Sequence, residues 1–467
     1  MSFSHRTDYR VKFQQMPARP ASPLSPVLVA MGLLAAVLLF AGCRLFPPVQ
    51  APFEPHVDLS GGLPVFPGAA GFGSTTVAGR EGAVIVVSNL NNDGAGSLRE
   101  ALLAEGPRVV VFEVAGVIEL ASRIDVVTPY LTIAGQTSPD PGITLIGSGI
   151  VISTHDVLVQ HIRTRPGDGE VGDDPENRDG IGVVGDRRGR TEVYNVVIDH
   201  CSVSWAIDEG MSTWYEGVHD VTFSNCIVAE NLSESLHPKG EHSKGLLVGD
   251  HSRRIAVIGN LFAHNTRRNP LLKGDTSALV AGNLIYNPGT QAVGFSDPEW
   301  SGPSRATIVG NVFIPGPDTD GSTELLWRGS ETSDNIQVYI NDNLVIEGTT
   351  SDFLPPASIA EVLVTDPPVS VTPFSPAAAS TIESAILAGA GARAASRDGT
   401  DTRIVQSVVN RSGAIIDSQD EVGGYPVVAP VTAGLTIPPD PSGDDDADGY
   451  TNLEEWLHGL AEAVEAP

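Results

Sequence analysis

Cations are scarce in this chain of 467 residues. It has 28 lysines and arginines against 57 aspartates and glutamates, and its formal net charge is −29 at pH 7. A surface of that sign repels nucleic acid and other polyanions. We therefore expect no nucleic-acid partner, and a polyanionic substrate would need clustered cations or a bound metal ion. Charged residues make up only 18% of the chain and hydrophobic residues 41%, so we expect a sizeable core and not a disordered chain.

Cysteine is also scarce, with three residues in the whole chain. Cys43 lies at the end of an N-terminal targeting segment, which leaves Cys201 and Cys226 as a pair. We expect these two to be buried free thiols, although an oxidising compartment would permit a disulfide between them.

Only one long apolar run is present, from Val27 to Phe40, and it is short for a membrane span. It follows a basic region, and Ala41 and Gly42 come directly before Cys43. This arrangement is typical of a signal peptide, and it resembles a bacterial lipoprotein processing site. We expect residues 1–43 to be a lipoprotein-type signal, Cys43 to carry lipid, and the protein to be exported to the cell envelope or beyond. The alternatives are an uncleaved anchor and a plain secretory signal.

Helical patterns are few, whereas short β-rich runs recur. AVIGNLF (256–262), LVAGNLI (279–285) and TIVGNVF (307–313) repeat one pattern. Spacings of 23 to 35 residues without helical crossovers predict a solenoid whose strands stack as rungs of a parallel β-helix. Asparagines on successive rungs could stack as an amide ladder, and Cys201 and Cys226 would be neighbours. The asparagines in question are Asn225, Asn260, Asn283, Asn311 and Asn343.

The ends of a solenoid need caps, because they expose strand edges. GSLREALLAEGP (96–107) predicts a short N-terminal capping helix with Ser97 as its N-cap, and STIESAILAGAGA (380–392) predicts a similar helix in the C-terminal portion. The expected organisation is therefore a signal (1–43), a linker (44–62), one all-β β-helix domain (63–435), a second linker (436–443) and a tail (444–467).

The tail carries a calcium-loop pattern. DDDADGYTNLEE (444–455) fits D-x-D-x-D-G-x5-E, and a short helix over 453–464 is expected to follow. It resembles the single loops of dockerin-like and EF-hand tails. We expect a stabilising appendage; the alternative is an acidic solvated tail. The predicted ligands are Asp444, Asp446, Asp448, Tyr450, Asn452 and Glu455.

Chemistry is expected in the loops between rungs. Arg267, Arg268 and Lys273 gather within HNTRRNPLLKG (264–274), and carboxylates gather in 163–184 and 204–214. Clustered carboxylates in an exported protein favour Ca²⁺. The histidines of this region lack the close spacing of a zinc site, so none is expected.

Several motifs, in a consistent order, resemble the bacterial pectate lyases of polysaccharide lyase family 1. The resemblance implies a right-handed parallel β-helix and a calcium-dependent enzyme that cleaves polygalacturonate by β-elimination to unsaturated oligogalacturonides. The motifs are FPGAAGFG (66–73), SNLNNDGAGSLREAL (88–102), LTIAGQTSP (131–139), VIDHCSVSWAIDE (197–209), HSKGLLVGD (242–250), RRNPLLKG (267–274) and GAIIDSQDEVGGYP (413–426).

The resemblance also implies roles for individual residues. Arg268 would be the base; because a guanidinium is protonated at neutral pH, activity should rise well above neutrality. The chain departs from the family in two places: no further aspartate follows within 208–212, and lysine stands at position 273, where many members have an arginine that can bind a carboxylate bidentately. The implied calcium ligands are Asp179, Asp208 and Glu209, and the implied substrate-binding residues are Lys244, Lys273 and Arg267.

Two other interpretations remain open. A β-helical glycoside hydrolase, such as a polygalacturonase, needs carboxylates placed as acid and base around the bond. Asp208 and Glu209 are a poor pair for this, because adjacent strand residues point to opposite faces. A cell-surface protein could also bind acidic polysaccharide without cleaving it. In each case we expect a monomer whose partner is polygalacturonate or a related polymer, and which meets a membrane only through lipid on Cys43.

Overall fold

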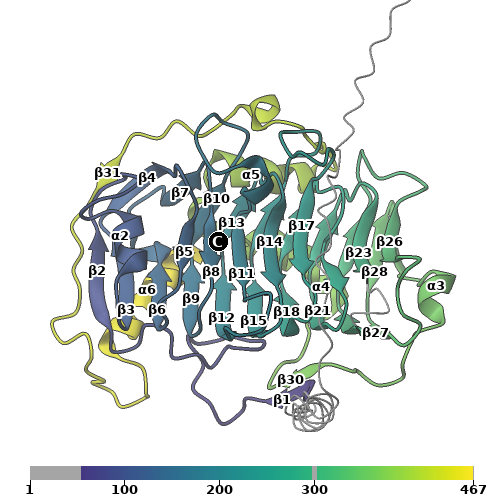
Figure 1. The fold of residues 1–467 in the computed structure, drawn as a ribbon, viewed down its shortest axis with the longest axis horizontal. Coiled ribbons are helices and arrows are strands. Elements are labelled where there is room, and N and C mark those ends of the chain that lie inside the picture. Colours follow the sequence, from purple (N-terminus) through teal and green to yellow (C-terminus); the bar gives the residue numbers. More distant parts are fainter. Residues whose placement is uncertain (1–53, 297–301, 466–467) are drawn as a thin grey trace, which may run out of the picture. The chain divides into compact units, whose positions relative to one another are not determined.

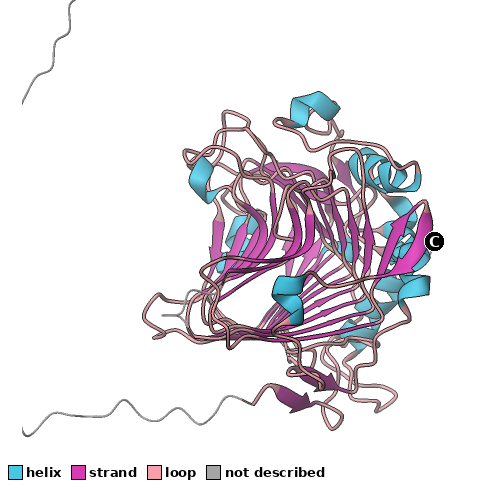
Figure 2. Ribbon diagram, turned by 90° about the vertical axis from the view of Figure 1, so that its right-hand side faces the viewer, coloured by secondary structure: helices cyan, strands magenta, loops and turns pink. Residues whose placement is uncertain are grey.

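The computed structural model describes residues 54–296 and 302–465, so the expected signal and Cys43 lie outside the described residues. The strands lie side by side along one axis, and successive turns of the chain add strands to three long sheets (Figures 1 and 2). The pairing is parallel along almost the whole length of each sheet, with antiparallel strands only at the ends of one. The expected right-handed parallel β-helix is thereby confirmed. Within the described ranges, no helix is both long and apolar enough to cross a membrane.

The strand bounds follow the sheet order. The ten-stranded sheet contains β2 (Ala83–Val87), β3 (Arg108–Phe112), β6 (Leu131–Ala134), β9 (Val157–Gln160), β12 (Val193–Asp199), β15 (Val218–Ser224), β18 (Arg253–Ile258), β21 (Ser277–Ala281), β24 (Arg305–Val309) and β27 (Gln337–Asn341). The eight-stranded sheet contains β5 (Ile124–Val126), β8 (Ile150–Ile152), β11 (Ile181–Val184), β14 (Glu209–Trp214), β17 (Lys244–Val248), β20 (Leu271–Lys273), β23 (Gln291–Ser296) and β26 (Glu324–Arg328).

The eleven-stranded sheet contains β4 (Val114–Glu119), β7 (Ile143–Ile146), β10 (Ile162–Arg165), β13 (Ser202–Ser204), β16 (Ile227–Ala229), β19 (Leu261–Ala263), β22 (Leu284–Tyr286), β25 (Val312–Ile314), β28 (Leu344–Glu347), β29 (Thr349–Asp352) and β31 (Val431–Thr432). A separate pair joins β1 (His56–Asp58) to β30 (Ser370–Thr372). The α-helices are α2 (Leu98–Leu103), α3 (Ala357–Ala360), α4 (Ala379–Gly389), α5 (Gly399–Val409) and α6 (Asn452–Glu465). Short 3-10 turns are η1 (Gly135–Thr137), η2 (Pro175–Asn177), η3 (Ala394–Ser396) and η4 (Gln419–Val422).

The core consists of hydrophobic side chains that stack on one another along the axis. The parallel register places Ile133 beside Val159, Val159 beside Ile198, and Ile198 beside Phe223, and all four side chains are fully buried. Alternate strand residues point into the interior, so each rung adds aliphatic surface to one continuous core. The recurring apolar runs of the sequence are the inner faces of these rungs.

The asparagine ladder is present at Asn260, Asn283, Asn311 and Asn343, and it differs from the expected ladder by one residue at a single rung, that of Asn225. The amide groups of Asn260, Asn283 and Asn311 each donate to the side-chain oxygen of the next ladder asparagine at 2.9–3.0 Å. Asn225 bonds to Asp199 instead. The ladder position of its rung is taken by Cys226, whose backbone N–H donates to Asn260 Oδ1 at 2.9 Å.

Cys226 has Cys201 as its neighbour on the previous rung, and the Cys201 N–H lies 3.4 Å from Cys226 Sγ. Both cysteines are buried free thiols, as expected.

The N-terminal cap forms as predicted: Ser97 accepts a hydrogen bond from the Glu100 N–H, and α2 buries Leu98, Ala101 and Leu102. The second predicted helix also forms, as α4, but it packs along the eleven-stranded sheet against β22 and β25. The continuous parallel rungs end at β28, on which β29 folds back antiparallel. The expected β-helix domain of 63–435 therefore divides into rungs and a C-terminal segment that returns along their outside. Pairing of β1 with β30 likewise places part of the expected linker 44–62 within the folded unit.

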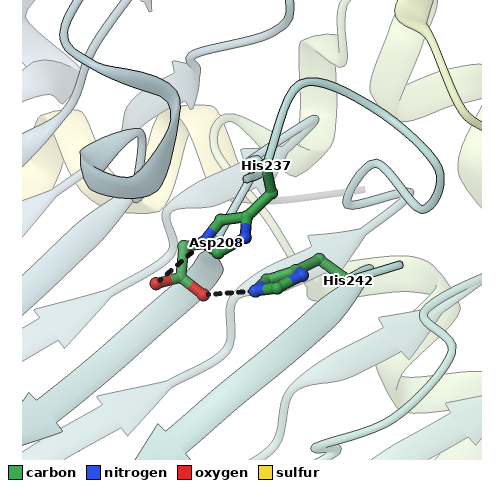
Figure 3. A group of neighbouring side chains, drawn as sticks. All are labelled: Asp208, His237 and His242. Carbon is green, nitrogen blue, oxygen red and sulfur yellow. Dashed lines mark ion pairs between the residues drawn. The ribbon is translucent and has the colours of Figure 1, made fainter. Parts of the chain in front are cut away.

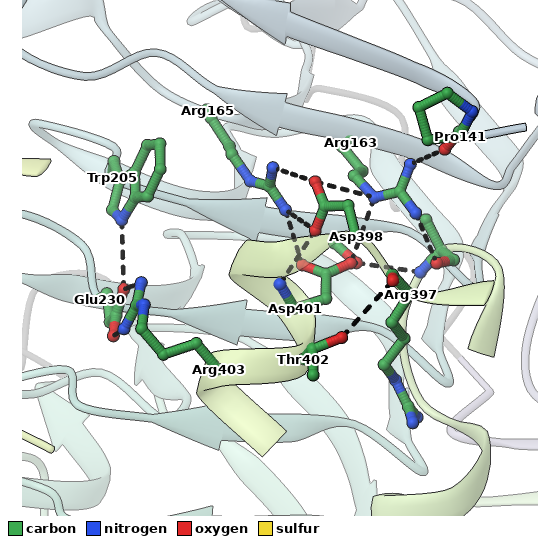
Figure 4. A network of polar contacts seen from close by, with 12 residues as sticks. Pro141, Arg163, Arg165, Trp205, Glu230, Arg397, Asp398, Asp401, Thr402 and Arg403 are labelled. Carbon is green, nitrogen blue, oxygen red and sulfur yellow. Dashed lines mark hydrogen bonds and ion pairs between the residues drawn. The ribbon is translucent and has the colours of Figure 1, made fainter. Parts of the chain in front are cut away.

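The returning segment is pinned by a buried ionic network (Figure 4). Arg165 of β10 donates to Asp398 at 3.0 Å and to Asp401 at 2.8 Å, and Arg163 donates to Asp401 at 3.2 Å. Asp398 is also the N-cap of α5. Since both arginines and Asp401 are almost completely buried, each charge depends on the others for compensation.

The C-terminal tail packs against the β-helix. Leu453 and Leu457 of α6 pack on Val109 and Val111 of β3, and Leu435 and Ile437 join the same cluster. The expected linker 436–443 is therefore itself packed at its start, through Ile437. The observed helix exceeds the predicted one by a residue at each end. At its C-terminal end, Glu465 lies 3.1 Å from the Nε2 atom of His161 and 3.5 Å from the Nδ1 atom of His200.

The stability of the fold around His200 should decrease at alkaline pH. Burial opposes protonation of His200, but Asp199 and Glu465 outweigh it and raise the pKa of His200 to about 9. Because the folded-state pKa lies above the ordinary value of 6.5, the stabilisation is complete below pH 6.5 and is lost as pH rises through about 9. We expect the free energy of unfolding to fall by up to about 3 kcal/mol across that window.

Denaturant unfolding at several pH values measures this slope. His200→Gln should flatten it, whereas His56→Gln, a change at an exposed histidine on β1, should not. An unchanged slope in His200→Gln would contradict the assignment.

Candidate active site

The residues expected to carry the chemistry meet at one edge of the eight-stranded sheet, where its strands begin. Asp179 lies two residues before β11, Asp208 directly precedes β14, and Arg268 lies three residues before β20. Glu209 and Lys244 are the first residues of β14 and β17, and they are paired in register. Parallel strands therefore bring together side chains that are far apart in the sequence.

Three carboxylates form the centre of this edge. Ligand oxygens of Asp179, Asp208 and Glu209 all lie within 4.8 Å of one another, and Asp179 Oδ1 accepts the Glu209 N–H at 2.9 Å. Burial, together with Glu209 and Asp208, raises the pKa of Asp179 well above its ordinary value. Burial also raises the pKa of Glu209, although Arg268 opposes this. Since hard cations prefer several oxygen ligands, this set fits Ca²⁺.

Two cations contact these carboxylates directly. Lys244 Nζ lies 2.9 Å from Asp208 Oδ1 and 3.7 Å from Glu209 Oε1, while Arg268 pairs with Glu209. Burial, and secondarily Arg268, lowers the pKa of Lys244. The edge thus combines a cation-binding carboxylate cluster with two positively charged donors, which suits binding of a ligand carboxylate and proton transfer beside it.

The other two expected cations are placed differently. Arg267 is half-buried, and its backbone forms an isolated parallel β-bridge with that of Lys244. No carboxylate of the described residues pairs with the Arg267 side chain. Lys273 ends β20 at the opposite edge of the sheet, and its Nζ lies 2.8 Å from Asp250. The expected role of Lys273 in substrate binding stays a prediction, at a position away from the carboxylate cluster.

Two histidines at the site were not anticipated (Figure 3). The rings of His237 and His242 stack with centroids 3.4 Å apart, and their Nε2 atoms lie 3.8 Å and 3.3 Å from the Asp208 oxygens. The Nδ1 atom of His237 accepts the Lys239 N–H at 3.2 Å, so in the neutral ring the proton is on Nε2, which faces Asp208. At 3.8 Å this N–H is too far from Asp208 for a hydrogen bond, so the contact between the ring and the carboxylate is electrostatic only. The five-residue gap between the histidines gave no metal-site signal in the sequence.

The predicted loop of the tail also gathers its carboxylates. Oxygens of Asp444, Asp446 and Asp448 lie within 4.8 Å of one another at the surface. Asn452 Oδ1 accepts the Asp445 N–H at 3.1 Å, and Glu455 follows in the first turn of α6. Desolvation and the nearby aspartates raise the pKa of Glu455. These oxygen donors fit a hard cation.

Comparison with known proteins gives long matches. The protein named "Probable pectate lyase C" of Aspergillus flavus is 36% identical over 431 residues, which cover 85% of this chain and 94% of that protein. The protein of the same name from Emericella nidulans is 33% identical and covers 85% of this chain and 93% of its own length. A comparison with models of protein families gives no match.

Solved structures share the fold. The thermostable pectate lyase PL 47 superposes with a TM-score of 0.52 at 15% identity, covering 69% of this chain and 97% of its own. Jun a 1, the major allergen from cedar pollen, gives a TM-score of 0.51 at 18% identity, covering 68% and 91%. The relatives that match over most of the chain are fungal, whereas the motifs suggested bacterial ones, so the expected resemblance is confirmed at the level of the family. The chain is a lyase and belongs to the pectate lyase family.

Proposed function

We propose that this lyase cleaves polygalacturonate by calcium-dependent β-elimination and releases unsaturated oligogalacturonides. The observation that carries the proposal is the meeting of an oxygen-donor cluster with two cations at the start of β14 and β17. A polyanionic chain needs such a device on a protein of net charge −29. The names of the fungal relatives support pectate as the substrate class.

In the proposed reaction, Asp179, Asp208 and Glu209 hold Ca²⁺, which when bound supplies positive charge beside the uronate carboxylate. Lys244 binds a substrate carboxylate. Arg268 in its neutral form takes the proton from C5, and the electron pair of the C5–H bond forms the C4–C5 double bond while the C4–O bond breaks. Water protonates the departing oxygen, which becomes the hydroxyl of the new reducing end. Glu209 pairs with Arg268 and also belongs to the carboxylate set that would hold the ion, so a bound ion would compete with Arg268 for this carboxylate. Lys244 donates to Asp208 at 2.9 Å and His242 Nε2 lies 3.3 Å from the same oxygen, so these two residues hold Asp208 in place.

Removal of calcium should abolish elimination. With polygalacturonate at alkaline pH, we expect ultraviolet absorbance of unsaturated uronate in the presence of Ca²⁺ and none with excess chelator, with full recovery when Ca²⁺ is restored. Activity should also be higher above neutral pH than below it.

The same assay separates the two alternatives. New reducing ends without absorbance would identify a hydrolase. Retention of the polymer without either signal would identify a binding protein.

We also propose that the tail loop binds a second Ca²⁺ through Asp444, Asp446, Asp448, Tyr450, Asn452 and Glu455, and thereby holds α6 on the ten-stranded sheet. The loop leads directly into α6, and Glu454 beside it pairs with Arg80 at 2.8 Å. A ligand at 100 times its dissociation constant stabilises the folded state by about 2.7 kcal/mol.

Thermal unfolding tests this second site. Calcium should raise the Tm of the wild type and of Asp445→Asn, a matched control because position 445 is the second of the loop and supplies no ligand. The double variant Asp446→Asn, Asp448→Asn should lose most of that increase. An equal increase in all three proteins would refute the tail site.

Finally, we propose that residues 1–43 direct export and that Cys43 carries lipid. The small residues before Cys43 support this, as does a substrate class found outside cells. Mass spectrometry of the mature N-terminus would reveal a diacylglycerol on Cys43 or a different cleavage site.

A further inference from the structure

The eight-stranded sheet has a second edge, formed by the ends of its strands, opposite the edge that carries Arg268. β11 ends at Val184, β14 at Trp214, β17 at Val248 and β20 at Lys273, and these four strands follow one another in the sheet. Figure 1 shows β11, β14 and β17 side by side. The five steps from Glu209 to Trp214 span about 16 Å at the usual rise per residue. The surface between the two edges is therefore wide enough for more than one sugar.

An aromatic surface is built into this second edge. Successive strand residues normally point to opposite faces, but Tyr215 has a left-handed backbone with φ 78, and its ring lies 5.3 Å from that of Trp214. The Trp214 ring lies over the end of β17, where Gly249 leaves room for it: a Cβ atom there would come within 2.6 Å of the ring. The position of Trp214 thus depends on a glycine of the neighbouring strand.

One cation beside these rings is not neutralised. Arg187 donates from Nε to Tyr215 Oη at 2.9 Å, and its guanidinium lies 5.2 Å from the ring centre. Arg187 is exposed, and no carboxylate of residues 54–296 or 302–465 pairs with it. Lys273, above Trp214, is paired with Asp250, and Arg190 is paired with Asp186. In an acidic protein, an ordered arginine without an acidic partner is available to an anion.

We propose that Arg187, Tyr215 and Trp214 form a distal subsite that binds a uronate residue of the polysaccharide away from the bond that is cut. The guanidinium would bind the sugar carboxylate, and the aromatic rings would contact an apolar sugar face. The identity of the ligand as an acidic polysaccharide rests on the proposed function. The site itself extends the contact of a long chain across the sheet, so it favours polymer over short oligomers.

The test compares Arg187→Gln with Arg190→Gln, a matched control that removes an arginine of the same loop already paired with Asp186. On polygalacturonate, Arg187→Gln should raise KM by about threefold to fivefold relative to Arg190→Gln. A factor of this size is expected for the loss of one exposed ion pair together with a cation–π contact. On trigalacturonate the two variants should have the same KM. Tyr215→Leu should show the same dependence on chain length as Arg187→Gln.

A binding measurement without turnover completes the test. Migration through gels that contain polygalacturonate and excess chelator should be less retarded for Arg187→Gln than for Arg190→Gln. If the two variants match in both KM on polymer and retardation, the subsite is refuted. If the wild type produces no elimination, the proposed function fails, but the difference in retardation still reports on the subsite. Circular dichroism confirms that each variant is folded.

Discussion

Replacement of Arg268 by alanine should reduce kcat on polygalacturonate by about 100-fold to 10,000-fold, the usual contribution of a positioned acid or base. The side chain reaches the carboxylate cluster through Glu209, so its removal takes away the proposed proton acceptor beside the bound uronate. The rate is followed by the absorbance of unsaturated product. Arg268→Lys should remain strongly impaired, because it restores charge but not the guanidinium geometry.

Arg267 provides the control for that experiment. It is the adjacent arginine and is half-buried, but within the described structure it has no acidic partner in the cluster. Arg267→Gln should therefore lose less than tenfold in kcat, with any larger effect in KM. A wild-type kcat in Arg268→Ala, or equal losses at the two positions, would exclude Arg268 as the base.

The second large effect concerns stability. Asp401→Ala should lower the free energy of unfolding by about 3–5 kcal/mol, the usual cost of leaving a buried charge uncompensated. Asp401 is completely buried and accepts hydrogen bonds from Arg163 and Arg165 (Figure 4). It also accepts a hydrogen bond from Ser202. Its loss leaves two buried guanidinium groups short of a partner. Denaturant unfolding gives the difference.

Glu383→Ala is the matched control for the buried network. It breaks the 2.6 Å pair between Glu383 and Arg411, both of which are partly exposed, and should cost less than about 1 kcal/mol. Similar losses in the two variants would show that the network around Asp401 contributes no more than a surface ion pair.

The rung pattern was readable from the sequence because it is local and repeats. Each rung carries its own apolar run, and Asn260, Asn283, Asn311 and Asn343 mark equivalent corners. The predicted ladder position was wrong by one residue at Asn225. On that rung Cys226 holds the ladder position, and the sequence motif was aligned with the asparagine next to it. The ladder residue of each rung is defined by its hydrogen bond to the next rung, which the sequence pattern does not contain.

The site was predictable in part, for a related reason. Asp179, Asp208, Glu209, Lys244 and Arg268 lie at equivalent points just before or at the start of strands, so stacking brings them together. Lys273 is five residues beyond Arg268, and strand direction carries it to the other edge. His237 and His242 reach Asp208 from a loop whose path depends on tertiary contacts. No periodicity encodes such a path.

The return of the C-terminal segment has a consequence for the order in which the chain can mature. Solenoid rungs contact only their neighbours and can form as they are made. Here α5 and α6 are among the last parts synthesised, yet they cover β10 and β3, which are among the first. Until synthesis is complete, the early rungs expose apolar surface and two unpaired arginines. We therefore expect a chain that stops before α5 to leave Val109, Val111, Arg163 and Arg165 uncovered near its N-terminal rungs, and to be more sensitive to proteases than a chain that includes α5 and α6.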